Sequence, residues 1–225
     1  MKKFTKTLAL LLAGVWAVTS MTACQNESDG NTPPTPEEYM ESVRSDADMI
    51  IHRVVRYGTE DGEKTFTYTY ERDGDLLKNT TDGTVTMVRY YDFANEKVYF
   101  NSSGKWEAYG FSYDDDGWDE YLEDEMEIRF SMVSDEELVW KIDNYRKDGD
   151  RYVMTEEAVN AIVEQEENFH DSYGANPVLS ISFEKKDGAY VFIEYLQGED
   201  ESIYMENVIT VTLKDVTVEL PEVDE

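Results

Sequence analysis

Thr65-Phe66-Thr67-Tyr68-Thr69-Tyr70 is a stretch in which threonines and aromatic residues alternate without a break. In an extended chain successive side chains point to opposite faces, so the rings would lie on one face and the threonines on the other. Both residue types favour the pleated surface of a sheet. The stretch therefore predicts a β-strand with an aromatic face and a polar face.

Similar runs follow along the chain, separated by residues that favour turns. The predicted strands span residues 76–81, 84–92, 97–101 and 105–111. The turn residues between them are Asp73-Gly74, Asp82-Gly83, Asn95-Glu96 and Ser103-Gly104. Such pairs tolerate the positive φ angles and supply the local hydrogen bonds of tight turns. Together with the first strand, these runs predict an antiparallel meander of five strands.

A helix is predicted before the meander. Thr35-Pro36-Glu37-Glu38 supplies a capping hydroxyl, a proline at the first helical position and an acid three residues after the cap. Apolar residues then recur at helical spacing, and they are Tyr39, Val43, Ala47, Ile50, Ile51 and Val54. This pattern predicts one amphipathic helix over residues 36–55, which would include His52.

The second half of the chain mixes helical and strand patterns. Helices are predicted over residues 118–126, 134–140 and 155–169, with a hairpin around residues 147–150. Strands are predicted over residues 178–184 and 189–196 and in a final run through Ile209 to residue 221. This order predicts an α+β fold in which one large antiparallel sheet has about three helices on one face.

The order of these elements resembles a known family of carriers. A long N-terminal helix, an antiparallel sheet, helices inserted midway and a closing strand over residues 211–221 are similar to the periplasmic lipoprotein carriers and mycobacterial lipid-carrying lipoproteins, the LolA-like and LppX-like proteins. The resemblance spans residues 36–221. It implies that the sheet is curved into a half-barrel, that the helices form a lid, and that a lipid or acyl chain lies between them. The resemblance identifies no ligand-binding residue in this chain.

The N-terminus has the pattern of a signal peptide. Lys2, Lys3 and Lys6 precede an apolar run over residues 8–18, which is shorter than the roughly 20 residues that span a bilayer. Met21-Thr22-Ala23-Cys24 then resembles the lipobox of bacterial lipoproteins, with methionine in place of the usual leucine. The resemblance implies that residues 1–23 are removed and that Cys24 carries a lipid that anchors the protein outside the cytoplasm on the cell membrane.

Cys24 is the only cysteine of the chain, so no disulfide forms within it. The alternative interpretation is an ordinary secretory signal in which this cysteine has no role. Residues 24–35 are polar apart from the anchor cysteine and two prolines, and a third proline follows at position 36, so this segment predicts a flexible tether. Residues 36–225 would then form a single domain.

The charge excludes one class of partner. The 225 residues include 50 acidic and 20 basic side chains, for a formal net charge of −30. Loss of three lysines with the signal peptide would lower it to −33, because that segment has no acid. Nucleic acid is therefore not expected as a partner, since its binding needs clustered Lys and Arg.

The densest acidic segment contains a candidate calcium loop. Ser112, Asp114, Asp116, Gly117 and Glu123 occupy positions one, three, five, six and twelve of an EF-hand-like loop. Oxygen ligands at this spacing bind a hard cation, and glycine permits the sharp turn. Two departures weigh against a site, namely Ser112 in place of the first aspartate and Asp119 at the eighth position. The alternative is a solvated acidic face opposite Trp118, Tyr121, Leu122 and Met126.

The aromatic residues allow two interpretations. They include Tyr68, Tyr70, Tyr91, Tyr99, Trp106, Tyr109, Trp118 and Trp140. In a carrier such side chains would line an apolar cavity, whereas in a solid domain they would be core residues and cross-strand pairs.

No catalytic motif is present in the sequence. The two histidines, His52 and His170, belong to no HExxH pattern, and no GxSxG elbow or phosphate-binding loop occurs. We therefore expect a protein without catalytic residues or cofactor. Two functions stay open, an anchored protein that binds a lipid or other apolar ligand, and a surface module with a solid core that contacts another protein.

Overall fold

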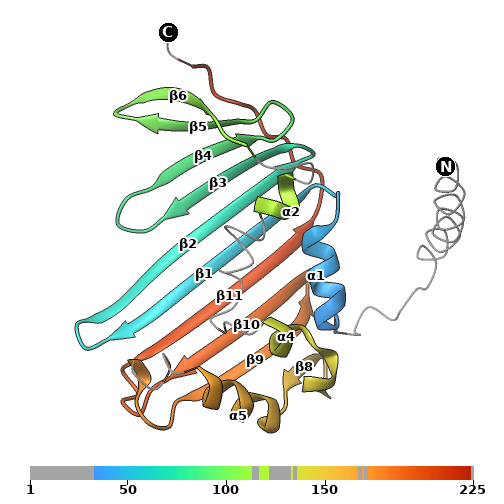
Figure 1. The fold of residues 1–225 in the computed structure, drawn as a ribbon, viewed down its shortest axis with the longest axis vertical. Coiled ribbons are helices and arrows are strands. Elements are labelled where there is room, and N and C mark those ends of the chain that lie inside the picture. Colours follow the sequence, from blue (N-terminus) through green and yellow to red (C-terminus); the bar gives the residue numbers. More distant parts are fainter. Residues whose placement is uncertain are drawn as a thin grey trace, which may run out of the picture. The chain divides into compact units, whose positions relative to one another are not determined.

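The computed structural model describes residues 33–112, 117–121, 133, 136–166, 169 and 172–223. These residues belong to one compact unit, Pro33–Glu225. They form an α+β fold with one large, curved, open antiparallel sheet and helices against one face (Figure 1). The predicted fold class is therefore confirmed.

The described elements follow one another in two groups of strands. The first half contains α1 (Pro36–Arg44), β1 (Met49–Thr59), β2 (Gly62–Asp73), β3 (Leu76–Asp82), β4 (Met87–Asp92), β5 (Lys97–Ser102) and β6 (Lys105–Gly110). The connecting region contains α2 (Gly117–Tyr121), α4 (Glu136–Trp140) and the 3₁₀ turn η2 (Ile142–Asn144). The second half contains β7 (Tyr145–Asp148), β8 (Arg151–Met154), α5 (Glu156–Gln165), β9 (Val178–Lys186), β10 (Ala189–Gln197) and β11 (Tyr204–Leu213).

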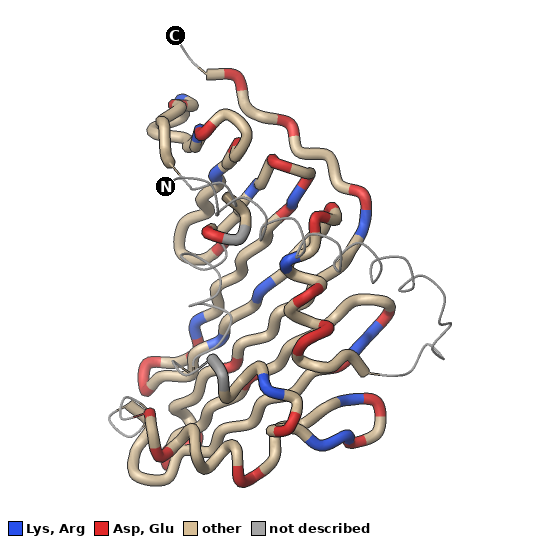
Figure 2. Tube along the Cα trace, turned by 45° about the vertical axis from the view of Figure 1, so that its right-hand side comes forward, with Lys and Arg blue, Asp and Glu red and all other residues tan. Residues whose placement is uncertain are grey.

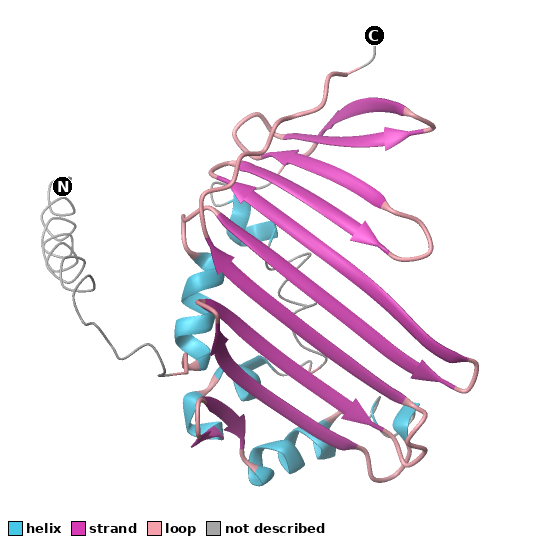
Figure 3. Ribbon diagram, turned by 180° about the vertical axis from the view of Figure 1, so that it is seen from behind, coloured by secondary structure: helices cyan, strands magenta, loops and turns pink. Residues whose placement is uncertain are grey.

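The first and last strands of the sheet pair with each other at its centre. The strand order is β6-β5-β4-β3-β2-β1-β11-β10-β9-β8-β7, and β1 aligns antiparallel with β11 from Met49 opposite Leu213 to Gly58 opposite Tyr204. The first half is thus a meander that runs from the centre outward to the β6 edge, and the second half is a meander that runs from the β7 edge back to the centre. Because β6 and β7 are the two edges, the chain between them has to cross the sheet, and α2 and α4 lie on that crossing (Figures 1 and 3).

The predicted helix over residues 36–55 is wrong beyond Arg44. The start is as expected, because Thr35 and Glu38 form the reciprocal capping box, at 2.8 and 3.1 Å. After Ser45, however, the chain is extended and residues 49–59 form β1. The apolar residues at positions 50, 51, 54 and 55 fit both the helical and the strand periodicity. All four are β-branched, and β-branched residues favour a strand. The first half therefore has six strands where five were predicted.

The final strand is also shorter than predicted. β11 ends at Leu213, whose partner Met49 is the first residue of β1, so no strand residue is left to pair with beyond this point. The following segment is irregular but tied to the sheet, because the Val218 amide donates to a carboxylate oxygen of Asp73 at 3.0 Å. Figure 1 shows this segment running along the ends of the neighbouring strands.

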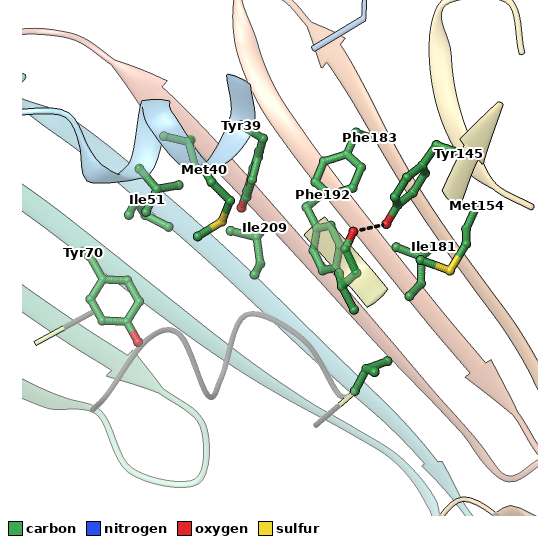
Figure 4. Packing of buried hydrophobic residues seen from close by; sticks show 14 of the residues in the cluster. Tyr39, Met40, Ile51, Tyr70, Tyr145, Met154, Ile181, Phe183, Phe192 and Ile209 are labelled. Carbon is green, nitrogen blue, oxygen red and sulfur yellow. Dashed lines mark hydrogen bonds between the residues drawn. The ribbon is translucent and has the colours of Figure 1, made fainter. Parts of the chain in front are cut away.

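The core lies between the sheet and its helices. From α1, Tyr39 contacts Phe183 and Phe192 with ring centroids 5.3 and 6.0 Å apart, and Trp140 of α4 stacks on the same cluster. The hydroxyl of Tyr145 donates to the backbone oxygen of Val139 at 2.7 Å (Figure 4). Large rings therefore fill the space over β9 and β10.

Candidate functional site

A pocket of about 770 Å³ lies at the other end of the sheet. We call it the β4–β6 pocket. It is lined by Val85, Thr86, Met87, Val88, Arg89, Tyr91, Val98, Phe100, Asn101 and Trp106. A volume of this size is typical of sites for small organic ligands, which are commonly lined by apolar side chains with few polar groups.

The strand register brings five of these residues to one face. Arg89 is opposite Phe100 and Tyr91 is opposite Val98, while Met87 is two residues before Arg89 and so shares its face. Tyr91 is also opposite the core residue Leu77. This face of β4 and β5 therefore continues the helix-covered face of the sheet.

Tyr91 marks the boundary between the core and the pocket. It is 8% exposed and its ring lies 4.9 Å from that of Tyr121 in α2. Further along the same strand, Met87 is 50% exposed, and Val85 in the preceding loop is 71% exposed. An apolar surface that begins in the core and then opens to solvent is a common feature of ligand and partner sites.

The lining contains one charged side chain, Arg89. It is exposed, and within the described part of the chain its guanidinium makes neither a hydrogen bond nor an ion pair. By contrast, Arg56 is paired with Glu206 and Lys78 with Glu71. The pocket thus combines apolar walls with a cation that has no partner among the described residues.

A second group of polar side chains lies on the same face, at the centre of the sheet. The Nε of Arg53 donates to Oδ1 of Asn207 at 2.9 Å, and Nδ2 of Asn207 lies 3.2 Å from Oε2 of Glu194. The three residues come from the adjacent strands β1, β11 and β10, and we call them the polar ladder. The side chains of Asn207 and Glu194 are fully buried.

Burial shifts the pKa of Arg53 in the polar ladder and that of the nearby Tyr145. Burial lowers the pKa of Arg53, while Tyr70, Tyr68 and Glu194 act against that shift. Burial raises the pKa of Tyr145, and the negative charge of Glu194 raises it further. Since the acid and the amide have no exposed surface, this group holds the centre of the sheet together and is not placed for acid–base chemistry on a ligand from solvent.

Neither the polar ladder nor the position of Arg89 in the pocket was predicted from the sequence, and the reasons differ. The predicted helix over residues 36–55 includes Arg53, and a helix at this position gives no indication of neighbours on β11. Glu194 carried a usable signal, because it stands between Phe192 and Leu196 where the alternation of β10 requires an apolar side chain. A charge at an inward position indicates a buried partner. Arg89 offered no such signal, since a strand near a sheet edge commonly carries basic residues.

Of the predicted aromatic residues, most lie in the core, two line the pocket, and Tyr109 is exposed. Tyr70, Trp118 and Trp140 lie in or against the core, and Trp118 donates to the backbone oxygen of Val43 at 3.3 Å. Tyr91 and Trp106 line the β4–β6 pocket. Most of these rings thus serve as core, in line with the second interpretation, and two contribute to a cavity as in the first.

Several predicted residues lie outside the described ones. These are the anchor Cys24, the calcium-loop residues Asp114, Asp116 and Glu123, and His170. Ser112 is described and exposed. Within the described ranges, no cluster of three or more His, Cys, Asp or Glu side chains is arranged to hold a metal ion.

His52 lies on β1 and not on a helix. Its Nδ1 is 3.2 Å from Oγ1 of Thr69 on β2, and the side chain is exposed. Even-numbered positions of β1 point away from the face that carries Ile51 and Val55, so His52 is on the face opposite the helices.

Neither the protein-family models nor the curated proteins include a match to this chain. None of the helices described here has the length and apolar character needed to cross a bilayer. The candidate site therefore rests on its own geometry.

Proposed function

We propose that this chain is a lipid-anchored extracytoplasmic protein without enzymatic activity, whose domain binds a lipid or other apolar ligand in the β4–β6 pocket. One observation carries the proposal. The face that is filled by rings over β9 and β10 continues into a 770 Å³ pocket at β4 and β5, with Val85 and Met87 open to solvent.

Burial of a ligand's chain in this pocket would be driven by the hydrophobic effect. Each methylene removed from water contributes about 0.8 kcal/mol. Val98 and Phe100 offer apolar surface on the face shared with Met87. Hydrocarbon chains need no specific partner atoms, so a lining without a dense hydrogen-bonding pattern suits them.

Lipid extraction tests the binding proposal. The chain from residue 24 onward, with Cys24→Ser so that no anchor acyl chain is counted, is purified without detergent and its extract analysed by mass spectrometry. We expect a bound apolar molecule at a fixed ratio to protein. Val85→Asp should reduce that ratio severalfold because it places a charge in the lining.

Val178 provides a matched control. It is 58% exposed at the start of β9, on the other half of the sheet. Val178→Asp makes the same chemical change outside the pocket and should leave the ratio unchanged. A wild-type chain without bound ligand, or equal loading of the Val85→Asp variant, would contradict the proposal.

Metabolic labelling tests the anchor separately. Cells given a clickable fatty acid should label the full chain, and Cys24→Ser should remove that label. If the variant stays labelled to the same extent, the lipid is not on Cys24.

A second candidate function is a protein-interaction module with a solid core. The packing of Tyr39, Phe183 and Phe192 favours it, because that half of the domain is filled by its own side chains. Asp and Glu are spread over many turns, which gives an acidic outer surface (Figure 2). Crosslinking in cells would support it by recovering one recurring protein together with a domain free of lipid.

A further inference from the structure

Arg89 is placed to recognise the polar end of a bound molecule. It lies on β4 opposite Phe100, on the same face as Met87, and is the one charged residue among the ten that line the pocket. A ligand whose hydrocarbon part contacts Val98 and Phe100 would have its other end within reach of this guanidinium. The charge of the ligand's polar end then decides whether that contact is favourable.

Acidic residues on β3, β4 and β6 have hydrogen-bond donors of their own. Asp82 accepts a hydrogen bond from the Thr86 hydroxyl at 2.7 Å, and Asp92 accepts from both the backbone and the side chain of Asn95. Glu107, opposite Phe100 on β6, accepts from the Tyr109 hydroxyl at 2.5 Å. In the described residues Arg89 is therefore left as a donor group with no protein acceptor.

A guanidinium presents parallel N–H donors that match a carboxylate. In a chain with a formal charge of −30, a cation in an apolar lining, with no acceptor from the described residues, is a local exception to the surrounding field. The same field opposes anions in proportion to their charge. One cation in a negative field therefore favours a ligand with a single negative charge.

We propose that the pocket binds a fatty acid, with its carboxylate on Arg89 and its hydrocarbon chain along Val98 and Phe100. This proposal rests on the proposed function, since it needs the pocket to hold an apolar chain. The volume of about 770 Å³ suits one chain better than several.

Three probes with the same sixteen-carbon chain separate the head group from the hydrocarbon. They are hexadecanoate, hexadecanol and hexadecyltrimethylammonium, each used below its micelle concentration. Dissociation constants are measured by calorimetry on the chain from residue 24 with Cys24→Ser. We expect hexadecanoate to bind about tenfold more tightly than hexadecanol, as for a charged hydrogen bond in a partly exposed site. The cationic probe should bind most weakly.

Variants assign this preference to Arg89. Arg89→Gln should make hexadecanoate and hexadecanol bind equally, whereas Arg89→Lys should keep part of the preference. Arg146, exposed on the edge strand β7, serves as the control, because Arg146→Gln removes the same charge far from the pocket in the strand order. That variant should keep the full preference.

The outcomes distinguish the two proposals. If none of the probes binds, both proposals fail. If wild type binds hexadecanol as tightly as hexadecanoate, the fatty-acid assignment fails while the apolar pocket stands. A preference that survives in Arg89→Gln places the carboxylate elsewhere and also overturns the assignment.

Discussion

The helix-covered face of the sheet is packed differently at its two ends. Over β9 and β10, Phe183 and Phe192 are fully buried and pack with Tyr39 from α1. At β4, Met87 is half exposed and lines a pocket. Both ends are apolar, and rings also pack at the Tyr91 end of β4, where Tyr91 contacts Phe93 and Tyr121. The Met87 end of the same strand is open to solvent. If the proposed function holds, the packed end supplies stability and the open end of β4 keeps a surface available for a ligand.

The largest expected change in the free energy of unfolding comes from truncating a side chain at the packed end of the sheet, compared with one at the open end. Phe192→Ala should reduce the free energy of unfolding by about 3–5 kcal/mol, because it leaves a cavity in a close-packed core. Met87→Ala should change it by less than about 0.5 kcal/mol, as for other exposed positions. Urea denaturation of both variants measures the two values. Similar losses would mean that the ends do not differ.

The next largest loss of stability is expected from a substitution in the polar ladder. Glu194→Leu should cost about 3 kcal/mol, because it removes a fully buried acid from the hydrogen-bonded chain that reaches Arg53. The double variant Arg53→Met, Glu194→Leu should recover part of this loss, since no charge is then left without its partner. A double variant less stable than the sum of both single losses would refute the coupling.

A smaller contribution to stability, that of the Tyr145 hydroxyl, depends on pH. Tyr145→Phe should cost about 1.5 kcal/mol at pH 8, where it removes the hydrogen bond to Val139. Burial raises the pKa of Tyr145, so the unfolded chain loses this proton first. The stability contributed by the neutral hydroxyl is present below pH about 10 and is lost as the pH rises above it. The gap between wild type and variant should therefore narrow from pH 8 to pH 11, and a constant gap would contradict the burial of this group.

The fold class was predictable because turn pairs and alternating runs are local signals. β2 to β6 lie close to the predicted ranges, and Asp73-Gly74 and Ser103-Gly104 do form turns between strands. Residues 49–59 were not predictable in the same way, because their apolar positions satisfy both the helical and the strand period. Pairing with β2 and β11 decides between the two, and the pairing with β11 is far from local, because it places Met49 opposite Leu213.

The candidate site was less accessible to sequence reasoning. Val85, Met87 and Arg89 look like ordinary strand residues, and their importance follows from the register that places Arg89 opposite Phe100. Glu194 was recognisable as an inward charge, but its partner Asn207 was not. The aromatic residues could not be divided between core and pocket from the sequence. The alternation along a strand shows which side chains share a face of the sheet, but it does not show whether other elements cover that face.

The most direct measurement is a methyl NMR titration of the chain from residue 24, with Cys24→Ser, by hexadecanoate. It observes both ends of the sheet in one sample. We predict that methyl signals of Val85, Met87 and Val98 shift with added ligand while those of Ile181 and Ile209, in the packed core, stay in place. Shifts that appear at Ile181 and Ile209 but not at Met87, or no shifts at all, would contradict the account.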